Sequence, residues 1–119
     1  MNDFLNEGYI FHGTGKGQSL NIQRDGFMKP KNTGEEKPSI SFTDDLDYAD
    51  YYGSVKAGAN KVILRTKLDD RFKLSPRIKD NKGDEYITFD KIPSSDLEIM
   101  SKKGWQPLDK WNVIFDEPK

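Results

Sequence analysis

The chain has no cysteine and only one histidine among its 119 residues. It can therefore form neither a disulfide framework nor a thiolate or histidine-rich metal site. A site built from carboxylates alone stays open, but no motif indicates one, and we expect no metal. The chain also lacks a strong charge of one sign, because 19 basic residues nearly balance 20 acidic ones. No strong long-range field would attract nucleic acid or acidic lipid.

Long apolar runs are absent as well. The N-terminal stretch "MNDFLNEGYI" lacks the basic flank and apolar run of a signal peptide, and no stretch has the length needed to cross a bilayer. We therefore expect a cytoplasmic protein with no membrane partner. The length suits one compact domain, residues 1–119, which we expect to be a monomer.

Stretches rich in β-branched and aromatic residues predict five strands, at 8–12, 39–43, 61–68, 85–90 and 111–117. Residues 17–26 have the length of a short helix that Gly26 could end in a left-handed conformation. A second helix would begin at a Thr43 cap. Its buried face would consist of Leu46, Ala49 and Gly53. Strands outnumber helices, which predicts an α+β fold.

Three further stretches have few apolar residues. Residues 29–39 and 69–84 contain turn-forming Pro, Gly, Asn and Asp and are predicted to be loops. The polar stretch 101–111 carries Trp105 and Trp111, which we expect to lie over an edge of the sheet.

The histidine, His12, stands at the end of the first predicted strand and directly before Gly13. A single histidine in such a place is more often a hydrogen-bonded structural residue than a catalytic one. However, glycine at this point would let a ligand come close to the backbone, whose N–H and C=O groups could bind a flat carboxamide along its edge. The following "GTGKG" fits neither the Walker spacing nor the dinucleotide fingerprint.

Two later positions could also carry chemistry. Ser41 lies in a strand that leads into a helix with Tyr48, Tyr51 and Tyr52. Such tyrosines could stack on an aromatic cation or pack in the core. Glu85 opens a strand directly after a loop, where a carboxylate either meets substrate or is simply solvated.

Three motifs together resemble the ADP-ribosyltransferase fold, in the His, Tyr, Glu branch of diphtheria toxin and the poly(ADP-ribose) polymerases. They are "IFHGT" with the later "IQRDGF", then "ISFTDDLDYADYYG", and finally "DEYITFD". The resemblance covers residues 8 to about 100. It implies a small split-sheet fold of mostly antiparallel strands with two short helices.

The chain departs from that pattern in two places. Ser41 occupies the strand position where this branch usually carries a tyrosine, and is similar to the serine of the Arg, Ser, Glu branch. The segment between Tyr51 and Glu85 is also much shorter than in the polymerases. The chain resembles a minimal phage or bacterial version, such as a toxin or phage effector.

The resemblance implies an NAD-dependent mono-ADP-ribosyltransferase that releases nicotinamide. Glu85 and His12 would be the catalytic residues, with Tyr51 and Tyr48 stacking on the nicotinamide ring. The residues implied for binding NAD are His12, Gly13, Thr14, Ser41, Tyr48 and Tyr51. The sequence leaves the macromolecular acceptor open between protein and nucleic acid. Arginine modification is disfavoured, since Gly83 stands where arginine-modifying members carry glutamate.

Three alternatives stay open. The first is a catalytically inactive member that binds NAD, ADP-ribose or a protein partner, which Ser41 and the short middle segment favour. The second is a relative of the tRNA 2′-phosphotransferases, which share the "HGT" opening but use further Arg and His residues to hold RNA phosphate. The third is a small interaction or inhibitor module, which an exposed apolar patch around Trp105 and Trp111 would support.

Overall fold

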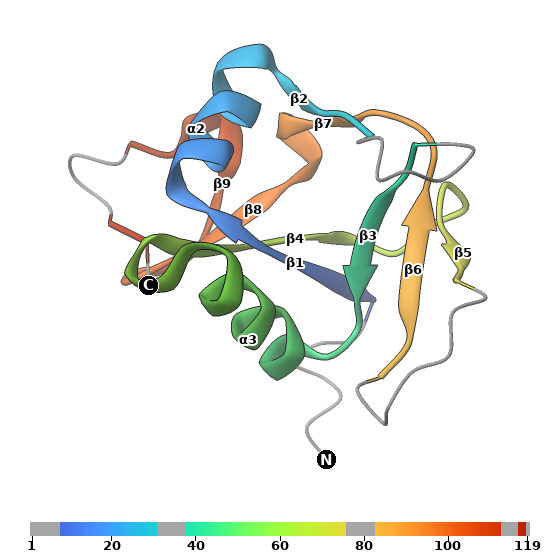
Figure 1. Cartoon of the computed structure of the whole chain (residues 1–119). Helices are drawn as coiled ribbons and strands as arrows, with labels where there is room; N and C mark the ends of the chain where they lie inside the picture. The colour runs from blue at the N-terminus through green and yellow to red at the C-terminus, as the bar shows by residue number, and fades with distance from the viewer. Residues whose placement is uncertain (1–7, 31–37, 76–82, 113–116, 119) are drawn as a thin grey trace.

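The computed structural model describes residues 8–30, 38–75, 83–112 and 117–118. They build a seven-stranded sheet in the order β5-β6-β3-β1-β4-β8-β9, in which all neighbouring strands are antiparallel (Figure 1). Its strands are β1 (Tyr9–Gly15), β3 (Ile40–Thr43), β4 (Lys61–Lys67), β5 (Lys73–Leu74), β6 (Glu85–Thr88), β8 (Glu98–Ser101) and β9 (Gly104–Pro107). A second, two-stranded sheet pairs β2 (Phe27–Met28) with β7 (Ile92–Pro93).

Two α-helices connect these strands. Helix α2 (Lys16–Asp25) follows β1, and helix α3 (Leu46–Ala57) follows β3. Short 3₁₀ turns are formed by η1 (Gly58–Asn60), η2 (Ser94–Asp96) and η3 (Leu108–Lys110). No described helix has the length and apolar character needed to cross a membrane. The predicted α+β class, with a mostly antiparallel sheet and two helices, is confirmed.

The helix ends agree only partly with the sequence-based expectation. Gly26 ends α2 at φ 84°, and its N–H donates to the carbonyl of Ile22, as predicted. The predicted Thr43 cap of α3 is wrong, because Thr43 is the last residue of β3. The cap is Asp45, whose carboxylate accepts the N–H groups of the first turn.

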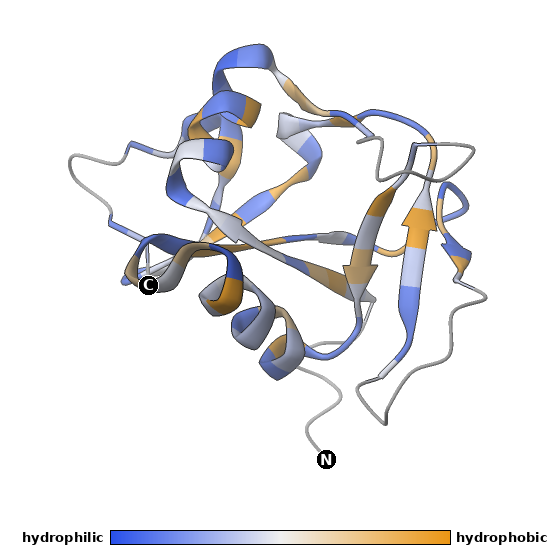
Figure 2. Cartoon of the chain, in the orientation of Figure 1, coloured by the Kyte–Doolittle hydropathy of each residue, from blue (hydrophilic) through white to orange (hydrophobic). Residues whose placement is uncertain are grey.

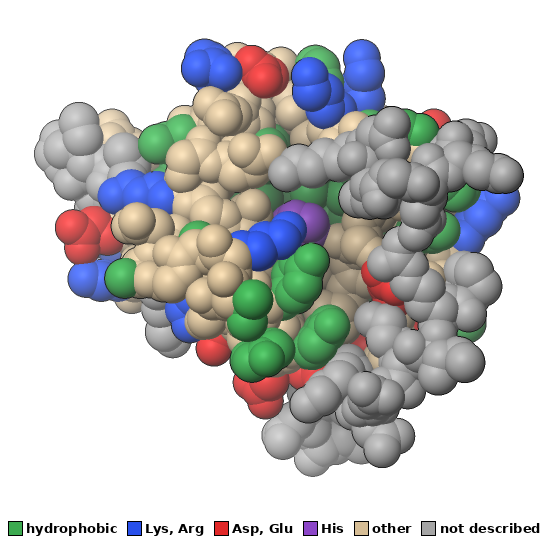
Figure 3. Space-filling model, viewed as in Figure 1, with side chains coloured by type: hydrophobic (Ala, Val, Ile, Leu, Met, Phe, Trp, Pro, Cys, Tyr) green, Lys and Arg blue, Asp and Glu red, His purple; other side chains and the backbone are tan. Residues whose placement is uncertain are grey.

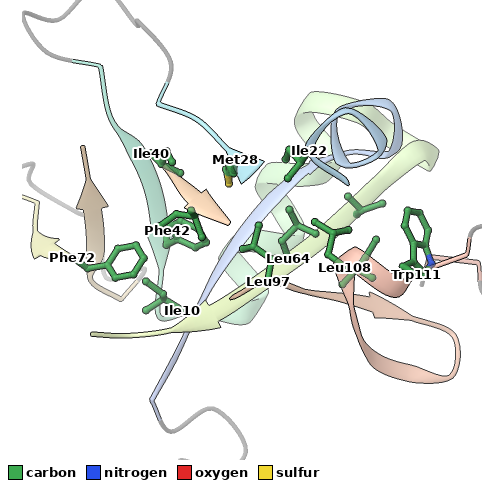
Figure 4. Close-up of a cluster of buried hydrophobic side chains, with 13 residues drawn as sticks. Ile10, Ile22, Met28, Ile40, Phe42, Leu64, Phe72, Leu97, Leu108 and Trp111 are labelled. Carbon is green, nitrogen blue, oxygen red and sulfur yellow. The ribbon is translucent and has the colours of Figure 1, made fainter. Parts of the chain in front are cut away.

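Apolar side chains form two clusters on opposite faces of the sheet. The larger one includes Ile10 and Leu64 and fills the space between the sheet, α2 and the small sheet (Figure 4). The smaller cluster consists of Phe11, Ala49 and Ile63 under α3. Figure 2 shows the strands carrying most of the hydrophobic colour. The predicted buried face of α3 is confirmed for Ala49 and Gly53, while Leu46 is half-buried and packs against the smaller cluster.

The C-terminal part of the sheet differs from the prediction. Residues 98–107, for which no strand was expected, form the β8–β9 hairpin, and β9 is itself the edge of the sheet. Trp111 is 5% exposed and belongs to the larger core, while Trp105 is half-buried against Phe11. Neither tryptophan is fully exposed, so among the described residues the pair forms no exposed patch that would favour an interaction module.

The other predicted boundaries are partly outside the described residues. In the expected strand 111–117, residues 113–116 lie outside the described residues, and residues 111–112 form no strand. Parts of the two expected loops, residues 31–37 and 76–82, also lie outside the described residues. The expected loop 69–84 contains the short strand β5. Both residues of β5 are exposed, so no buried apolar residue marks it as a strand.

The sheet splits between β1 and β3. Strand β1 pairs with β4 along its whole length, but with β3 only through Phe11 and Thr43. Continued antiparallel pairing would place Gly13 opposite Ser41, yet the strands have separated at that point. This split opens the sheet between the two helices.

Candidate functional site

A cavity of about 450 Å³ lies at the split between β1 and β3. Its walls come from the end of β1, from α2 and β2, from β3 and the start of β6, and from α3. This volume falls in the range usual for small-molecule sites. Figure 3 shows the single histidine, in purple, in the hollow at the centre of this face.

His12 lines the cavity and links the two separated strands. Its ring Nδ1 lies 2.6 Å from the carbonyl oxygen of Ser41. A carbonyl only accepts hydrogen bonds, so Nδ1 carries a proton, and in the neutral form of the ring Nε2 would be the acceptor nitrogen. The ring also packs against Phe42, with 5.4 Å between centroids. These contacts fix both the orientation and the tautomer of the imidazole.

Ser41 also contacts Glu85, the carboxylate that opens β6. The Ser41 hydroxyl donates to Glu85 Oε2, and both residues line the cavity. Glu85 is 9% exposed and stands opposite Thr43 in the β3–β6 ladder. The structure thus connects three residues from distant parts of the sequence, with the backbone of Ser41 bound to His12 and its side chain to Glu85.

Gly13 lines the cavity, but its lack of a side chain has a packing reason. A Cβ at this position would lie 2.1 Å from the carbonyl oxygen of Ala49 and 2.8 Å from the nitrogen of Gly53. The strand therefore crosses α3 backbone against backbone. The sequence suggested only that a ligand comes close here.

The three tyrosines of α3 occupy different faces. Tyr48 and Tyr52 line the cavity, with ring centroids 6.3 Å apart and planes inclined by 28°. Tyr51 does not line it and is 64% exposed. Each residue turns a helix by about 100°, so Tyr51 lies nearly opposite the buried Ala49 and Gly53. The structure therefore does not bring Tyr51 to this cavity with Tyr48 and the other predicted site residues.

Thr14 is another predicted binding residue that the structure does not bring to this cavity. It is 3% exposed and is not among the residues that line the cavity. The strand was predicted to end at His12, whereas β1 continues to Gly15 and pairs Thr14 with Val62. Thr14 is therefore a buried strand residue.

Sequence reasoning missed two groups of cavity residues. One is a polar face of α2, formed by Gln18, Asn21 and Asp25. Their spacing of three and four residues is a visible signal of one helix face. The other group consists of two cations among the described lining residues, Lys29 and Lys56. The Lys56 ammonium lies 4.7 Å from the centroid of the Tyr52 ring.

Among the described residues, no group of three or more His, Cys, Asp or Glu side chains could hold a metal ion. Comparisons of the chain with protein-family models, curated proteins and solved structures found no match. The function of this site is therefore inferred from its geometry and its sequence motifs.

Proposed function

We propose that the protein is an NAD-dependent mono-ADP-ribosyltransferase, which transfers ADP-ribose to a macromolecular acceptor and releases nicotinamide. The observation that carries this proposal is the connection of His12 to Glu85 through Ser41 at the wall of one cavity. The three motifs that resemble the ADP-ribosyltransferases supply these residues in the same order. The split sheet and its two helices are consistent with that fold.

The reaction needs a group that stabilises positive charge. As the bond between the nicotinamide nitrogen and the ribose breaks, its electron pair leaves with nicotinamide, and positive charge develops on the ribose. A carboxylate stabilises this charge more in the transition state than in the ground state, which is the condition for catalysis. Glu85 is the carboxylate of β6 at the cavity wall. The acceptor's nucleophile then bonds to the ribose carbon and loses its proton.

The other cavity residues would hold the substrate. His12, with a fixed tautomer, would accept a hydrogen bond from a ribose hydroxyl through Nε2, and Gly13 can present only backbone atoms to the carboxamide. Tyr48 and Tyr52 line the cavity, and the π faces of their rings would attract the positively charged nicotinamide ring. Lys29 and Lys56 would bring positive charge to the diphosphate.

The test compares the wild-type protein with Glu85→Gln, using NAD labelled in its adenylate. Nicotinamide release and transfer of label to a cell lysate are both followed. Glutamine keeps an oxygen that can accept from Ser41 but removes the charge, so we expect turnover to fall at least about 100-fold. The matched control is Asp47→Asn, which removes an exposed carboxylate of α3 that does not line the cavity.

The inactive binder and the interaction module give different results. If the wild-type protein does not consume NAD but is stabilised by it against heating, the protein is an inactive binder. Neither turnover nor stabilisation would leave only the interaction module. Full activity in Glu85→Gln would refute the assigned role of the carboxylate.

A further inference from the structure

Glu85 is held at the beginning of β6 by a connection that lies outside the cavity. One residue before Glu85, the backbone N–H of Asp84 donates to Asp44 Oδ1 at 2.8 Å. In return, the backbone N–H of Asp44 donates to the carbonyl of Asp84 at 3.1 Å. Thr43 and Glu85 form the last pair of the β3–β6 ladder. The Asp44 side chain therefore extends this ladder by one position.

Gly83, the residue before Asp84, has a backbone conformation and a lack of side chain that this connection requires. Gly83 has φ 78°, a left-handed conformation that disfavours residues with a side chain. A Cβ there would also lie 2.3 Å from Asp44 Oδ1 and 3.1 Å from Asp45 Cβ. The Asp44 carboxylate thus fills the space that a side chain at position 83 would need.

The backbone of Glu85 is also held from the side of β5, the other strand beside β6. Its carbonyl accepts the N–H of Ser75, which follows β5, at 2.8 Å. Pairing with β3 and β5 fixes the residue from both sides, and Asp44 fixes the chain just before it. A shift at Asp84 would pass directly to Glu85, which is the next residue.

We propose that Asp44 is a positioning residue, whose carboxylate holds the start of β6 so that Glu85 stays beside Ser41 at the cavity wall. This inference depends on the proposed function. Asp44 does not line the cavity, so it acts through the backbone and not on the substrate. A misplacement of about 1 Å in a reacting group can cost about 100-fold in rate. The contribution of one hydrogen bond to that placement is a fraction of this.

The neighbouring Tyr86 provides a readout that does not depend on activity. Burial, followed by the negative charges of Asp44 and Asp84, raises the pKa of the Tyr86 phenol above its usual value. Tyrosinate is negative, so removal of the Asp44 charge should lower this pKa. Asp44→Asn removes the charge but keeps an oxygen that can accept from Asp84, which separates the two effects of the carboxylate.

The experiment compares Asp44→Ala and Asp44→Asn with the wild type, with Asp47→Ala as an exposed control from the same helix end. We expect kcat for NAD to fall about tenfold in Asp44→Ala, because the orientation of the reacting group is lost. KM should change less than about twofold, since Asp44 touches no substrate. Asp44→Asn should retain most of the activity while the pKa of Tyr86, followed by NMR, decreases. The Asp84 amide should exchange with solvent faster only in Asp44→Ala.

The outcomes separate this inference from the proposed function. Wild-type kcat in a folded Asp44→Ala protein with faster Asp84 exchange would overturn the positioning role and leave the proposed function intact. Equal losses in Asp44→Ala and Asp44→Asn would assign the effect to charge, which also overturns it. A wild-type protein without NAD turnover would overturn both. If Asp44→Ala does not fold, Asp44→Glu, which displaces the carboxylate, should show the same loss of kcat, and unchanged kcat would refute the inference.

Discussion

Substitution of Gly13 by alanine tests whether this glycine serves packing or ligand access. The new Cβ would lie 2.1 Å from the Ala49 carbonyl oxygen, where ordinary contacts are about 3.5 Å. Helix α3 would have to move by at least about 1 Å. Overpacking of this kind costs about 1–3 kcal/mol, and we expect the upper end because the opposing atoms are backbone. At about 4 °C for each kcal/mol, Tm should fall by roughly 10 °C.

Thermal unfolding followed by circular dichroism measures this effect, and Gly17→Ala is the matched control. Among the described residues, no atom beyond the chain neighbours of Gly17 and the surrounding backbone of helix α2 lies within 4 Å of a Cβ there, so alanine should stabilise by up to about 1 kcal/mol. Because α3 carries Tyr48 and Tyr52, Gly13→Ala should also weaken stabilisation by NAD. An unchanged Tm would refute the packing argument, and lost NAD binding at unchanged Tm would show that the glycine serves the ligand alone.

Two further predictions concern the wall formed by α3. Tyr52→Ala should raise KM for NAD about two- to thirty-fold, because the loss of a cation–π partner costs about 0.5–2 kcal/mol, while Tyr51→Ala should leave KM unchanged. Equal effects of the two substitutions in initial-rate kinetics would contradict this placement. Lys56→Ala should raise KM about three- to tenfold through the loss of one charge-assisted contact with phosphate. This effect should shrink as salt is added, and a penalty that does not vary with ionic strength would argue against a charge contact.

The sequence predicted the parts of the fold that depend on apolar alternation, and also the glycine that ends α2, but not the residue that caps α3. Strands β1, β3, β4 and β6 lie where β-branched residues indicated them, within a few residues at each end. The β8–β9 hairpin was missed because its second strand, "GWQP", carries little apolar signal of its own. This segment is a strand because it pairs with β8, and the sequence of the segment itself does not indicate that pairing.

The candidate site was predictable in its strand residues and less so on its helix. His12, Ser41 and Glu85 come from three predicted strands, and they meet at one cavity. For the helix, motif order alone does not determine which face points inward. The buried pair Ala49 and Gly53 does determine it, and it was already visible in the sequence. The same pair directs Tyr52, and not Tyr51, toward the cavity.

The split in the sheet explains why a short chain can hold such a site. A continuous ladder between β1 and β3 would use the Ser41 carbonyl for backbone pairing and close the cavity. Because the strands separate beyond the Phe11–Thr43 pair, that carbonyl instead accepts a hydrogen bond from Nδ1 of His12. The small Ser41 side chain then reaches Glu85 from the adjacent strand. One residue at the split therefore connects His12 and Glu85, the two side chains to which we propose roles in binding and catalysis. The loss of strand pairing at this point is what makes that connection possible.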